Sequence, residues 1–209
     1  MKLYWSPRSP FVRKVMVCAH ELGIADRLEK IYTLVSVTGV NADMLRVNPL
    51  GRIPALVTDE GGVLYDSIVI CEFLDTRDGK HRLFPANGLA RWDALRRHAL
   101  ADGLLEMLVL WRSLRNPGAG APSPGLLDAF RTKVVSALAA AESEGLDPAR
   151  FDIGDVTLGV VLGYLDFRHP EMDWRREHTQ LADWFRAVAS RPSMQQSAPE
   201  DELERTRST

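Results

Sequence analysis

The first residues of chemical interest are a serine and a proline at the start of the first helical pattern, Ser9-Pro10. Serine is favoured as a helix N-cap, and proline is favoured at the first helical position. One interpretation is structural: the Ser9 hydroxyl accepts a hydrogen bond from a first-turn amide and stabilises the helix by about 1 kcal/mol. The other is chemical: the hydroxyl donates its own proton to an anion, and a thiolate held at a helix N-terminus has a lowered pKa. The two interpretations are compatible, and Ser6, a turn earlier, is the competing hydroxyl.

A second feature is the stretch Gly51-Arg52-Ile53-Pro54-Ala55-Leu56, where a proline stands at the start of a strand pattern. Proline is tolerated there because it removes only one donor from the strand ladder. A cis Ile53-Pro54 bond would instead offer the N–H and C=O of Ile53 to a peptide-like ligand. Most X-Pro bonds are trans, so both geometries stay open at this level.

A third feature is Tyr65-Asp66-Ser67, at a strand-to-helix junction. On the structural interpretation Ser67 starts the helix and Asp66 lies near its positive end. On the functional one the ligand carries an α-carboxylate, held by Ser67 and its backbone N–H, and an α-ammonium, held by Asp66. Together, at these spacings, the three features favour a ligand site over three unrelated caps.

The elements that must position these residues alternate between strand and helix patterns. The order β-α-β-α-β-β-α is predicted from strands at 2–5, 28–35, 53–58 and 63–65 and helices beginning near 11, 41 and 68. A linker rich in Gly, Pro and charge is expected at 79–87, and no convincing strand follows it. We therefore expect an α/β domain over 1–78 and an all-helical domain over 88–209.

The composition excludes several classes of function. The chain has 209 residues, a net charge of −2 and 45% hydrophobic residues, which argues against a nucleic-acid or membrane-surface protein. No apolar run approaches the roughly 18 residues of a membrane span. The two cysteines, Cys18 and Cys71, lie far apart within helical patterns, and the five histidines lack metal-ligand spacing. We expect a cytoplasmic protein without a metal.

With these features the chain resembles the glutathione S-transferases, in particular cytosolic, serine-type, bacterial-like members. The resemblance covers essentially the whole chain and is carried by SPFVRK, NPLGRIPAL, LYDS, FDIGDVTLG and LADWFRAVASRPSM. It implies a thioredoxin-like N-terminal domain that binds glutathione as co-substrate, without a metal. It also implies an all-α C-terminal domain that supplies an electrophile pocket and the contacts of a homodimer, and a role in detoxification.

The resemblance also assigns roles to individual residues. Ser9 would donate a hydrogen bond to the glutathione thiolate, and a serine there disfavours the mixed disulfide that a cysteine would form. Asp152, where Ser or Thr is usual in the family, should still cap its helix. The implied glutathione-binding set is Ser9, Phe11, Arg52 (glycine carboxylate), Ile53 (main chain, cysteinyl unit), Pro54, Asp66 and Ser67 (both γ-glutamyl head). The implied electrophile pocket is Phe11, Asp102, Met107 and Trp111, for which core packing and a solvated Asp102 are the alternatives.

Two kinds of function follow from these expectations. The first is an enzyme that activates the glutathione thiol for attack on a small apolar electrophile, with isomerase, dehalogenase or ether-cleaving chemistry as variants. The second is a non-enzymatic ligand-binding or adaptor protein on the same fold. The presence of Ser9, Ile53-Pro54 and Asp66-Ser67 together favours the enzyme. The expected partners are glutathione, a small hydrophobic electrophile and a second copy of the chain, with no nucleic acid and no membrane.

Overall fold

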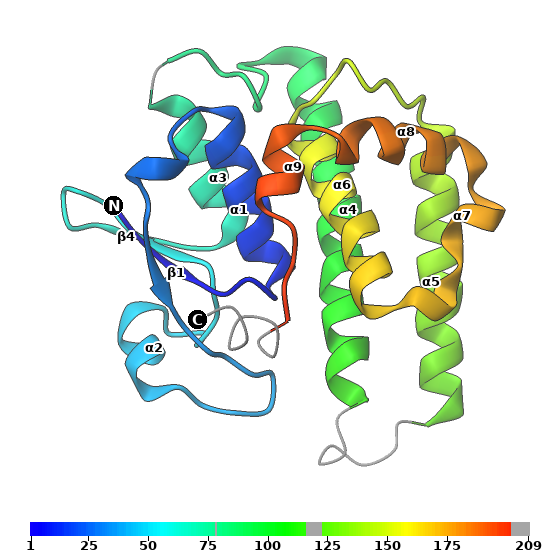
Figure 1. Ribbon diagram of the computed structural model, residues 1–209, viewed down its shortest axis with the longest axis horizontal. Coiled ribbons are helices and arrows are strands. Elements are labelled where there is room, and N and C mark those ends of the chain that lie inside the picture. Colours follow the sequence, from blue (N-terminus) through cyan, green and yellow to red (C-terminus); the bar gives the residue numbers. More distant parts are fainter. Residues whose placement is uncertain (78, 116–122, 202–209) are drawn as a thin grey trace. The chain divides into compact units, whose positions relative to one another are not determined.

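The computed structural model describes residues 1–77, 79–115 and 123–201, and it divides the chain into two units (Figure 1). The first unit comprises residues 1–86 together with the chain from Pro192 onward, and the second comprises 87–191. The predicted helical domain of 88–209 differs from the second unit at its C-terminal end. The last described residues, 192–201, belong to the α/β unit because the chain returns to it.

The first unit is built on a four-stranded sheet with the order β2-β1-β3-β4. Its strands are β1 (Lys2–Trp5), β2 (Glu29–Tyr32), β3 (Ala55–Val57) and β4 (Val63–Leu64). Strand β1 runs parallel to β2 and antiparallel to β3, and β3 runs antiparallel to β4. The predicted alternation of strands and helices is confirmed. Strand β1 has the predicted length, and β2, β3 and β4 are shorter than predicted.

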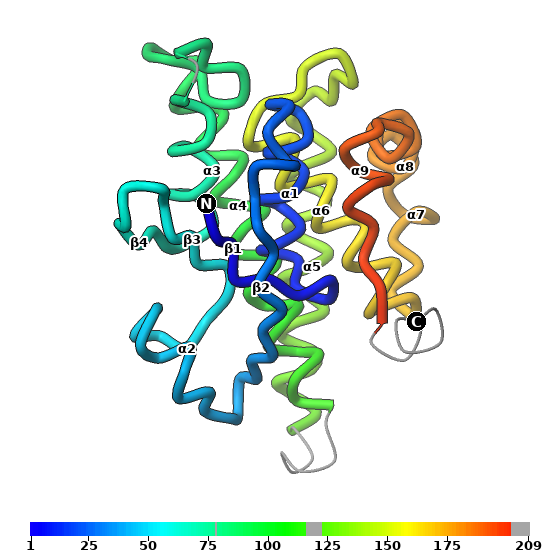
Figure 2. Tube along the Cα trace, turned by 60° about the vertical axis from the view of Figure 1, so that its left-hand side comes forward, coloured from blue at the N-terminus to red at the C-terminus, as the bar shows by residue number. Residues whose placement is uncertain are grey.

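Three helices of the first unit follow the predicted order, namely α1 (Pro10–Glu21), α2 (Ala42–Val47) and α3 (Ser67–Thr76). A short 3-10 helix, η1 (Ala25–Arg27), follows α1, and α9 (Pro192–Gln196) completes the unit. Helices α1 and α3 pack against each other (Figure 2). Cys18 of α1 and Cys71 of α3 are fully buried free thiols. Burial, together with the neighbouring Cys71 thiol, raises the pKa of Cys18, so both act as small core residues.

The end of α3 holds the middle of the predicted linker through one buried carboxylate. Asp75 is fully buried. Its Oδ1 accepts hydrogen bonds from the backbone N–H of Arg82 at 2.9 Å and of Leu83 at 3.1 Å. Its Oδ2 accepts from the N–H of Phe84 at 2.9 Å. The segment after α3 is therefore tied to the helix that carries Ser67 at its other end.

The second unit is helical throughout its described residues. It contains α4 (Gly88–Leu114), α5 (Pro124–Ser143), α6 (Ile153–Arg168), η2 (Pro170–Met172), α7 (Trp174–Glu177) and α8 (Thr179–Ala189). Helices α4 and α6 make the most extensive helix contact. Gly154 permits it, since a Cβ at that position would lie 2.8 Å from the Arg97 Cβ and 3.0 Å from the Ala94 carbonyl oxygen. None of the described helices is long and apolar enough to cross a membrane.

Candidate active site

The two hydroxyls at the start of the chain have different surroundings. Ser9 is the N-cap of α1, and its Oγ accepts a hydrogen bond from the Val12 N–H at 3.3 Å. A hydroxyl that accepts one hydrogen bond still has a proton to donate, so both interpretations of Ser9 hold in one geometry. Ser6 is buried, and its Oγ faces the Arg8 N–H at 3.4 Å. Ser9, which is half-buried, is therefore the hydroxyl at the open end of the helix.

The N-terminal end of α1 is suited to an anion. The helix has no acidic residue in its first turn. Basic side chains accompany it at Arg8, Arg13 and Lys14, and the Lys14 Nζ lies 5.7 Å from the centre of the Phe11 ring. The partial positive charge of the helix end favours an anion at this place. A thiolate at this place would be stabilised relative to its thiol.

The geometry of Ile53-Pro54, which the sequence leaves open, is cis. Strand pairing with β1 begins one residue later, where Ala55 faces Tyr4. Within the described part of the chain, no hydrogen bond involves the N–H or C=O of Ile53. The main chain of Ile53 is thus able to pair with an extended, peptide-like ligand.

The junction before α3 is a helix cap, as predicted, but the side chain that caps the helix is that of Asp66 and not that of Ser67. Asp66 is the N-cap, and its Oδ1 accepts from the Ile68 N–H at 3.3 Å. The Asp66 side chain is otherwise exposed, and the Tyr65-Asp66 peptide bond is also cis. Ser67 is the first residue of α3 and is buried. A charged carboxylate and a helix N-terminus therefore adjoin, which is a suitable arrangement for an α-amino-acid group.

Sheet topology brings these three places to one edge of the sheet. The end of β1, which leads to Ser9, lies beside the start of β3, because Tyr4 faces Ala55 in an antiparallel pair. The end of β4 lies at the same edge, because Leu64 faces Leu56 and the chain then runs toward Asp66. Ser9, Ile53-Pro54 and Asp66-Ser67 are far apart in sequence, but the strand register gathers them.

Two further polar residues near this edge have separate surroundings. Asn41 caps α2 by accepting from the Met44 N–H at 3.0 Å, and its Nδ2 donates to the Leu34 carbonyl at 2.9 Å. Asn41 is therefore engaged in its own loop. Arg52, assigned by resemblance to the glycine carboxylate, has an exposed side chain beside Ile53.

Of the predicted electrophile-pocket residues, Trp111 lines a groove in the second unit. The groove has a volume of about 630 Å³ and is lined by Trp111, Leu114, Arg115, Pro124, Leu127, Asp128, Arg131 and Glu171. Asp102 and Met107 do not line it, and Asp102 instead lies 3.9 Å from the His98 Nε2. Phe11 belongs to the first unit. Of the four residues, Trp111 is the one that lines this groove, and the electrophile pocket as a whole stays a prediction.

The groove is supported by a buried histidine that sequence reasoning missed. His169 is fully buried, with its ring centre 5.0 Å from that of Trp111. Its Nε2 lies 3.1 Å from the Leu108 carbonyl oxygen and its Nδ1 lies 3.2 Å from an Arg115 nitrogen. Burial, reinforced by the Arg115 charge, lowers the pKa of His169 to about 4. At neutral pH the ring is uncharged, with Nε2–H donating to Leu108 and Nδ1 accepting from Arg115.

The charges at the groove are partly neutralised. Arg115 forms an ion pair with Glu171 and lies over the Trp111 ring at 5.1 Å. Burial opposes ionisation of Glu171, but the hydrogen bond from Arg115, a backbone hydrogen bond and the Arg115 charge together outweigh it and lower the pKa of this carboxyl group. Asp128 and Arg131 add one charge of each sign from α5. The groove therefore combines an apolar floor with side-chain charges that sum to zero.

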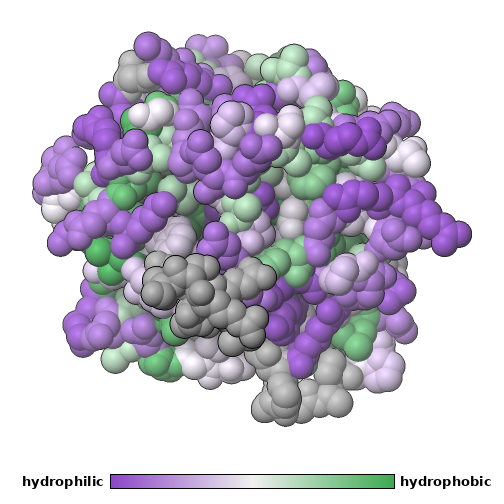
Figure 3. Space-filling view, in the orientation of Figure 1, coloured by the Kyte–Doolittle hydropathy of each residue, from purple (hydrophilic) through white to green (hydrophobic). Residues whose placement is uncertain are grey.

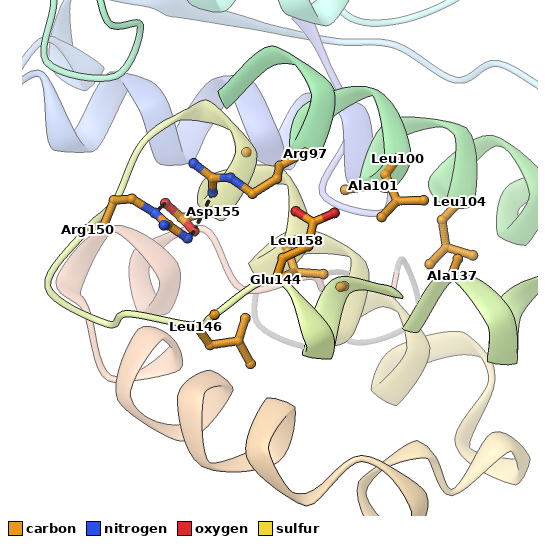
Figure 4. Close-up of a pocket in the computed structure, with 13 residues that line it drawn as sticks. Arg97, Leu100, Ala101, Leu104, Ala137, Glu144, Leu146, Arg150, Asp155 and Leu158 are labelled. Carbon is orange, nitrogen blue, oxygen red and sulfur yellow. Dashed lines mark hydrogen bonds and ion pairs between the residues drawn. The ribbon is translucent and has the colours of Figure 1, made fainter. Parts of the chain in front are cut away.

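A smaller cavity lies between α4, α5 and α6, next to the ion pairs and the helix cap at the start of α6 (Figure 4). Its volume is about 20 Å³, close to that of a single water probe. Arg97, Arg150 and Asp155 meet at one end, where Arg97 Nη1 lies 2.8 Å from Asp155 Oδ1 and Arg150 Nε lies 3.1 Å from Asp155 Oδ2. Asp152 and Asp155 form a capping box for α6, so Asp152 has the predicted capping role. Burial and the adjacent Asp155 raise the pKa of Asp152.

No group of three or more His, Cys, Asp or Glu side chains suited to a metal ion occurs in residues 1–77, 79–115 and 123–201. The arrangement at the sheet edge is instead one that can hold an amino-acid end, pair with an extended main chain and stabilise an anion. Each of these capacities uses residues that short motifs had singled out. The site residues themselves stay predictions of ligand contact.

Comparisons with known proteins match both halves of the chain. Residues 8–77 match the glutathione S-transferase N-terminal domain and residues 124–187 match the C-terminal domain. A glutathione transferase family member from Pseudomonas fluorescens Pf-5, solved with bound glutathione, is 42% identical with a TM-score of 0.89 and covers 96% of this chain and 99% of its own. A second structure from that organism, with bound S-(propanoic acid)-glutathione, is also 42% identical, with a TM-score of 0.85 and coverages of 96% and 100%.

A curated relative points the same way. The uncharacterized GST-like protein YibF of Escherichia coli K12 is 29% identical over 95% of this chain and 98% of its own length. Both domain models, the end-to-end alignments and the shared fold agree. The chain belongs to the glutathione S-transferase family.

Proposed function

We propose that this protein is a glutathione transferase that ionises the glutathione thiol and presents it to a small apolar electrophile. The observation that carries the proposal is the gathering of Ser9, Ile53-Pro54 and Asp66-Ser67 at one edge of the sheet. The relative from Pseudomonas fluorescens, which has 42% identity, was solved with glutathione bound. That relative supports glutathione as the ligand at this edge.

Glutathione would be held along its length by groups from three elements. The Asp66 carboxylate takes the γ-glutamyl ammonium, while the Ser67 hydroxyl and the first N–H groups of α3 take the γ-glutamyl carboxylate. The main chain of Ile53 pairs with the cysteinyl unit. Arg52 binds the glycine carboxylate, and Phe11 of α1 lies alongside the ligand.

Catalysis would consist of activating and positioning the sulfur. A cysteine-type thiol has a pKa of about 8.5, and each unit by which the site lowers it corresponds to about 1.4 kcal/mol. The Ser9 hydroxyl donates a hydrogen bond to the thiolate, and the α1 N-terminus stabilises its charge. The released proton passes to solvent, and the sulfur then forms a bond to the electrophilic carbon. In a substitution the leaving group departs with the electron pair of the broken bond, and in an addition the electron pair of an activated double bond moves to its far end and takes up a proton from solvent.

Thioether formation suits this chain better than disulfide exchange. Ser9 has no sulfur with which to form a mixed disulfide, and Cys18 is fully buried within α1. The S-(propanoic acid)-glutathione bound to the second relative is a thioether, which is the type of product that such a transfer makes. Isomerase, dehalogenase and ether-cleaving reactions would use the same activated thiolate.

The electrophile would bind over Trp111. The groove at this residue has a volume in the range of small-molecule sites, with an apolar floor and polar groups at its rim. Its lack of net charge favours a neutral or weakly polar electrophile. Stacking of Trp111 on Phe130, with ring centres 6.1 Å apart, keeps that floor in place.

We propose a cytoplasmic homodimer as the working form. Two buried free thiols suit a reducing compartment. Hydrophilic side chains predominate on the face drawn in Figure 3. Large apolar side chains are nevertheless exposed at Leu89 (82%) and Trp92 (66%) of α4, which is unusual unless a partner covers them.

The proposal is tested by titrating the thiol of bound glutathione, followed by ultraviolet thiolate absorbance, in wild type, Ser9→Ala and the control Ser6→Ala. We expect a thiol pKa well below about 8.5 in wild type and in Ser6→Ala, and a return toward that value in Ser9→Ala. Glutathione affinity should change little in Ser9→Ala because the γ-glutamyl and main-chain contacts persist. Binding with an unshifted thiol in wild type would refute the enzyme and favour the non-enzymatic binding protein.

A further inference from the structure

The C-terminal segment packs against the helix that carries the proposed catalytic serine. Helix α9 contacts α1, and both belong to the first unit (Figure 1). Ser193 and Met194 of α9 are buried, at 4% and 1% exposure. The chain thus leaves the helical unit at Arg191, and α9 packs against α1.

Two polar contacts join α9 to α1, one at its fourth residue and one at its last. The Arg13 Nη2 donates to the Met194 carbonyl oxygen at 3.2 Å. The Ser193 hydroxyl donates to the carboxylate of Glu21, the last residue of α1. A helix held at two points about two turns apart is restrained against both sliding and rotation along its axis.

Arg13 transmits this restraint to the active-site end of α1. Its own backbone N–H closes the first turn by donating to the Ser9 carbonyl oxygen at 2.9 Å. The side chain of the same residue is buried, with 9% exposure, and reaches α9. The residue that closes the turn behind Ser9 is therefore the residue that α9 holds.

The chemistry of this contact is unusual for simple packing. Its neighbours on α1 include buried valines at positions 12, 15 and 17. Burying a guanidinium costs several kcal/mol, and apolar replacements of buried charges are often neutral or stabilising. A specific carbonyl contact gives orientation in return, because a planar guanidinium donates in fixed directions.

We propose that Arg13 is a positioning residue for thiol activation, and that helix α9 (Pro192–Gln196) acts through it to hold the α1 N-terminus against the bound sulfur. The inference rests on the proposed function. Stabilisation of an anion by a helix end falls off within the first turn, so a small displacement of α1 weakens it. Loss of alignment should therefore raise the thiol pKa while the contacts that bind glutathione remain.

The test compares Arg13→Met, Arg13→Lys and Ser193→Ala with His20→Gln, a control change at an α1 residue that has no hydrogen bond or ion pair to α9. The readouts are the pKa of the bound thiol, the KM for glutathione and the pH profile of kcat/KM. We expect Arg13→Met to raise the thiol pKa by about one unit, which lowers the rate about tenfold below that pKa and restores it at higher pH. The KM for glutathione should stay within about twofold, and His20→Gln should match wild type.

The other two variants separate position from charge. Ser193→Ala leaves the Arg13 charge in place and removes only the hydrogen bond to Glu21. A rise in the thiol pKa of a few tenths of a unit in this variant therefore supports the positioning of α1 by α9. Arg13→Lys keeps the charge but loses the planar fork, so it should lie between wild type and Arg13→Met. If Arg13→Met does not fold, Ser193→Ala and Arg13→Lys still test the proposal, because each is expected to raise the thiol pKa.

Three results would overturn the inference. If the thiol pKa is unchanged in folded Arg13→Met and Ser193→Ala, α9 does not position α1 for thiol activation. If the thiol pKa is that of wild type in both Ser193→Ala and Arg13→Lys but shifts in Arg13→Met, the Arg13 charge acts without any positioning by α9. A rate lowered equally at every pH shows a purely structural role. An unshifted thiol in the wild-type protein would instead refute the proposed function itself.

Discussion

The fully buried Asp75 carboxylate offers the sharpest test of how the α/β unit is held together. It accepts hydrogen bonds from three consecutive backbone N–H groups, those of Arg82, Leu83 and Phe84, at 2.9 to 3.1 Å. Leu83 and Phe84 are themselves buried, at 2% and 1% exposure. Water therefore has little access to their N–H groups if the carboxylate is removed.

The magnitude follows from counting the groups left unsatisfied. A buried donor that loses its partner costs about 1–3 kcal/mol. Asp75→Ala orphans two buried N–H groups and one that is partly buried, so we expect a loss of about 3–5 kcal/mol in the free energy of unfolding. Asp75→Asn keeps one acceptor oxygen but turns an amide NH₂ toward the remaining donor, so a loss of about 2–3 kcal/mol is expected.

Urea unfolding followed by far-ultraviolet circular dichroism measures both variants, provided that the m value is unchanged. The control is Asp43→Asn, which alters an 85% exposed carboxylate paired with Arg46. That variant should lie within about 0.5 kcal/mol of wild type. An Asp75→Asn protein as stable as the control would refute the reasoning, because the three contacts would then contribute nothing net.

Three further predictions concern the second unit. Gly154→Ala should lower the free energy of unfolding in urea by about 1–3 kcal/mol, because the added Cβ would approach the Arg97 Cβ to 2.8 Å. The control is Gly103→Ala, which has open space around it and should be neutral or stabilising by up to about 1 kcal/mol. The pKa of His169 is lowered to about 4 in the folded protein, so between about pH 6.5 and pH 4 this side chain binds a proton in the unfolded state but not in the folded state. The free energy of unfolding should therefore fall by about 1–3 kcal/mol as the pH drops from 6.5 to 4, and His169→Gln should reduce this pH dependence. An equal pH dependence in both proteins would contradict the assignment. Trp111→Ala should raise the KM for an apolar electrophile severalfold and leave the KM for glutathione unchanged; a rise in the glutathione KM alone would exclude the groove as the electrophile site.

Most secondary-structure elements and their caps could be predicted from the sequence, because their determinants are local. Ser9, Asp66 and Asp152 each precede a helix that they cap. The side chain that caps and the amide that it caps lie only two or three residues apart, so local patterns suffice. The dipeptides Ser9-Pro10 and Asp66-Ser67 therefore marked both helix starts and candidate ligand groups.

The electrophile groove could be predicted only in part. Trp111 was identified on its helix, but His169, which supports it from beyond the end of α6, carried no motif. Its significance comes from complete burial between Trp111 and Arg115, which are more than fifty residues away in sequence. An isolated histidine gives no local signal of such surroundings, because desolvation depends on the packed neighbours.

The sequence by itself determined the order of elements, the helix caps and the family, since periodicity and short motifs encode them directly. Only the tertiary structure decided the cis geometry of Ile53-Pro54 and the return of residues 192–201 to the α/β unit. It also decided the strand register that places Ser9, Ile53 and Asp66 at one sheet edge. These features depend on contacts between distant segments, whose free energy is gained only when the whole unit packs.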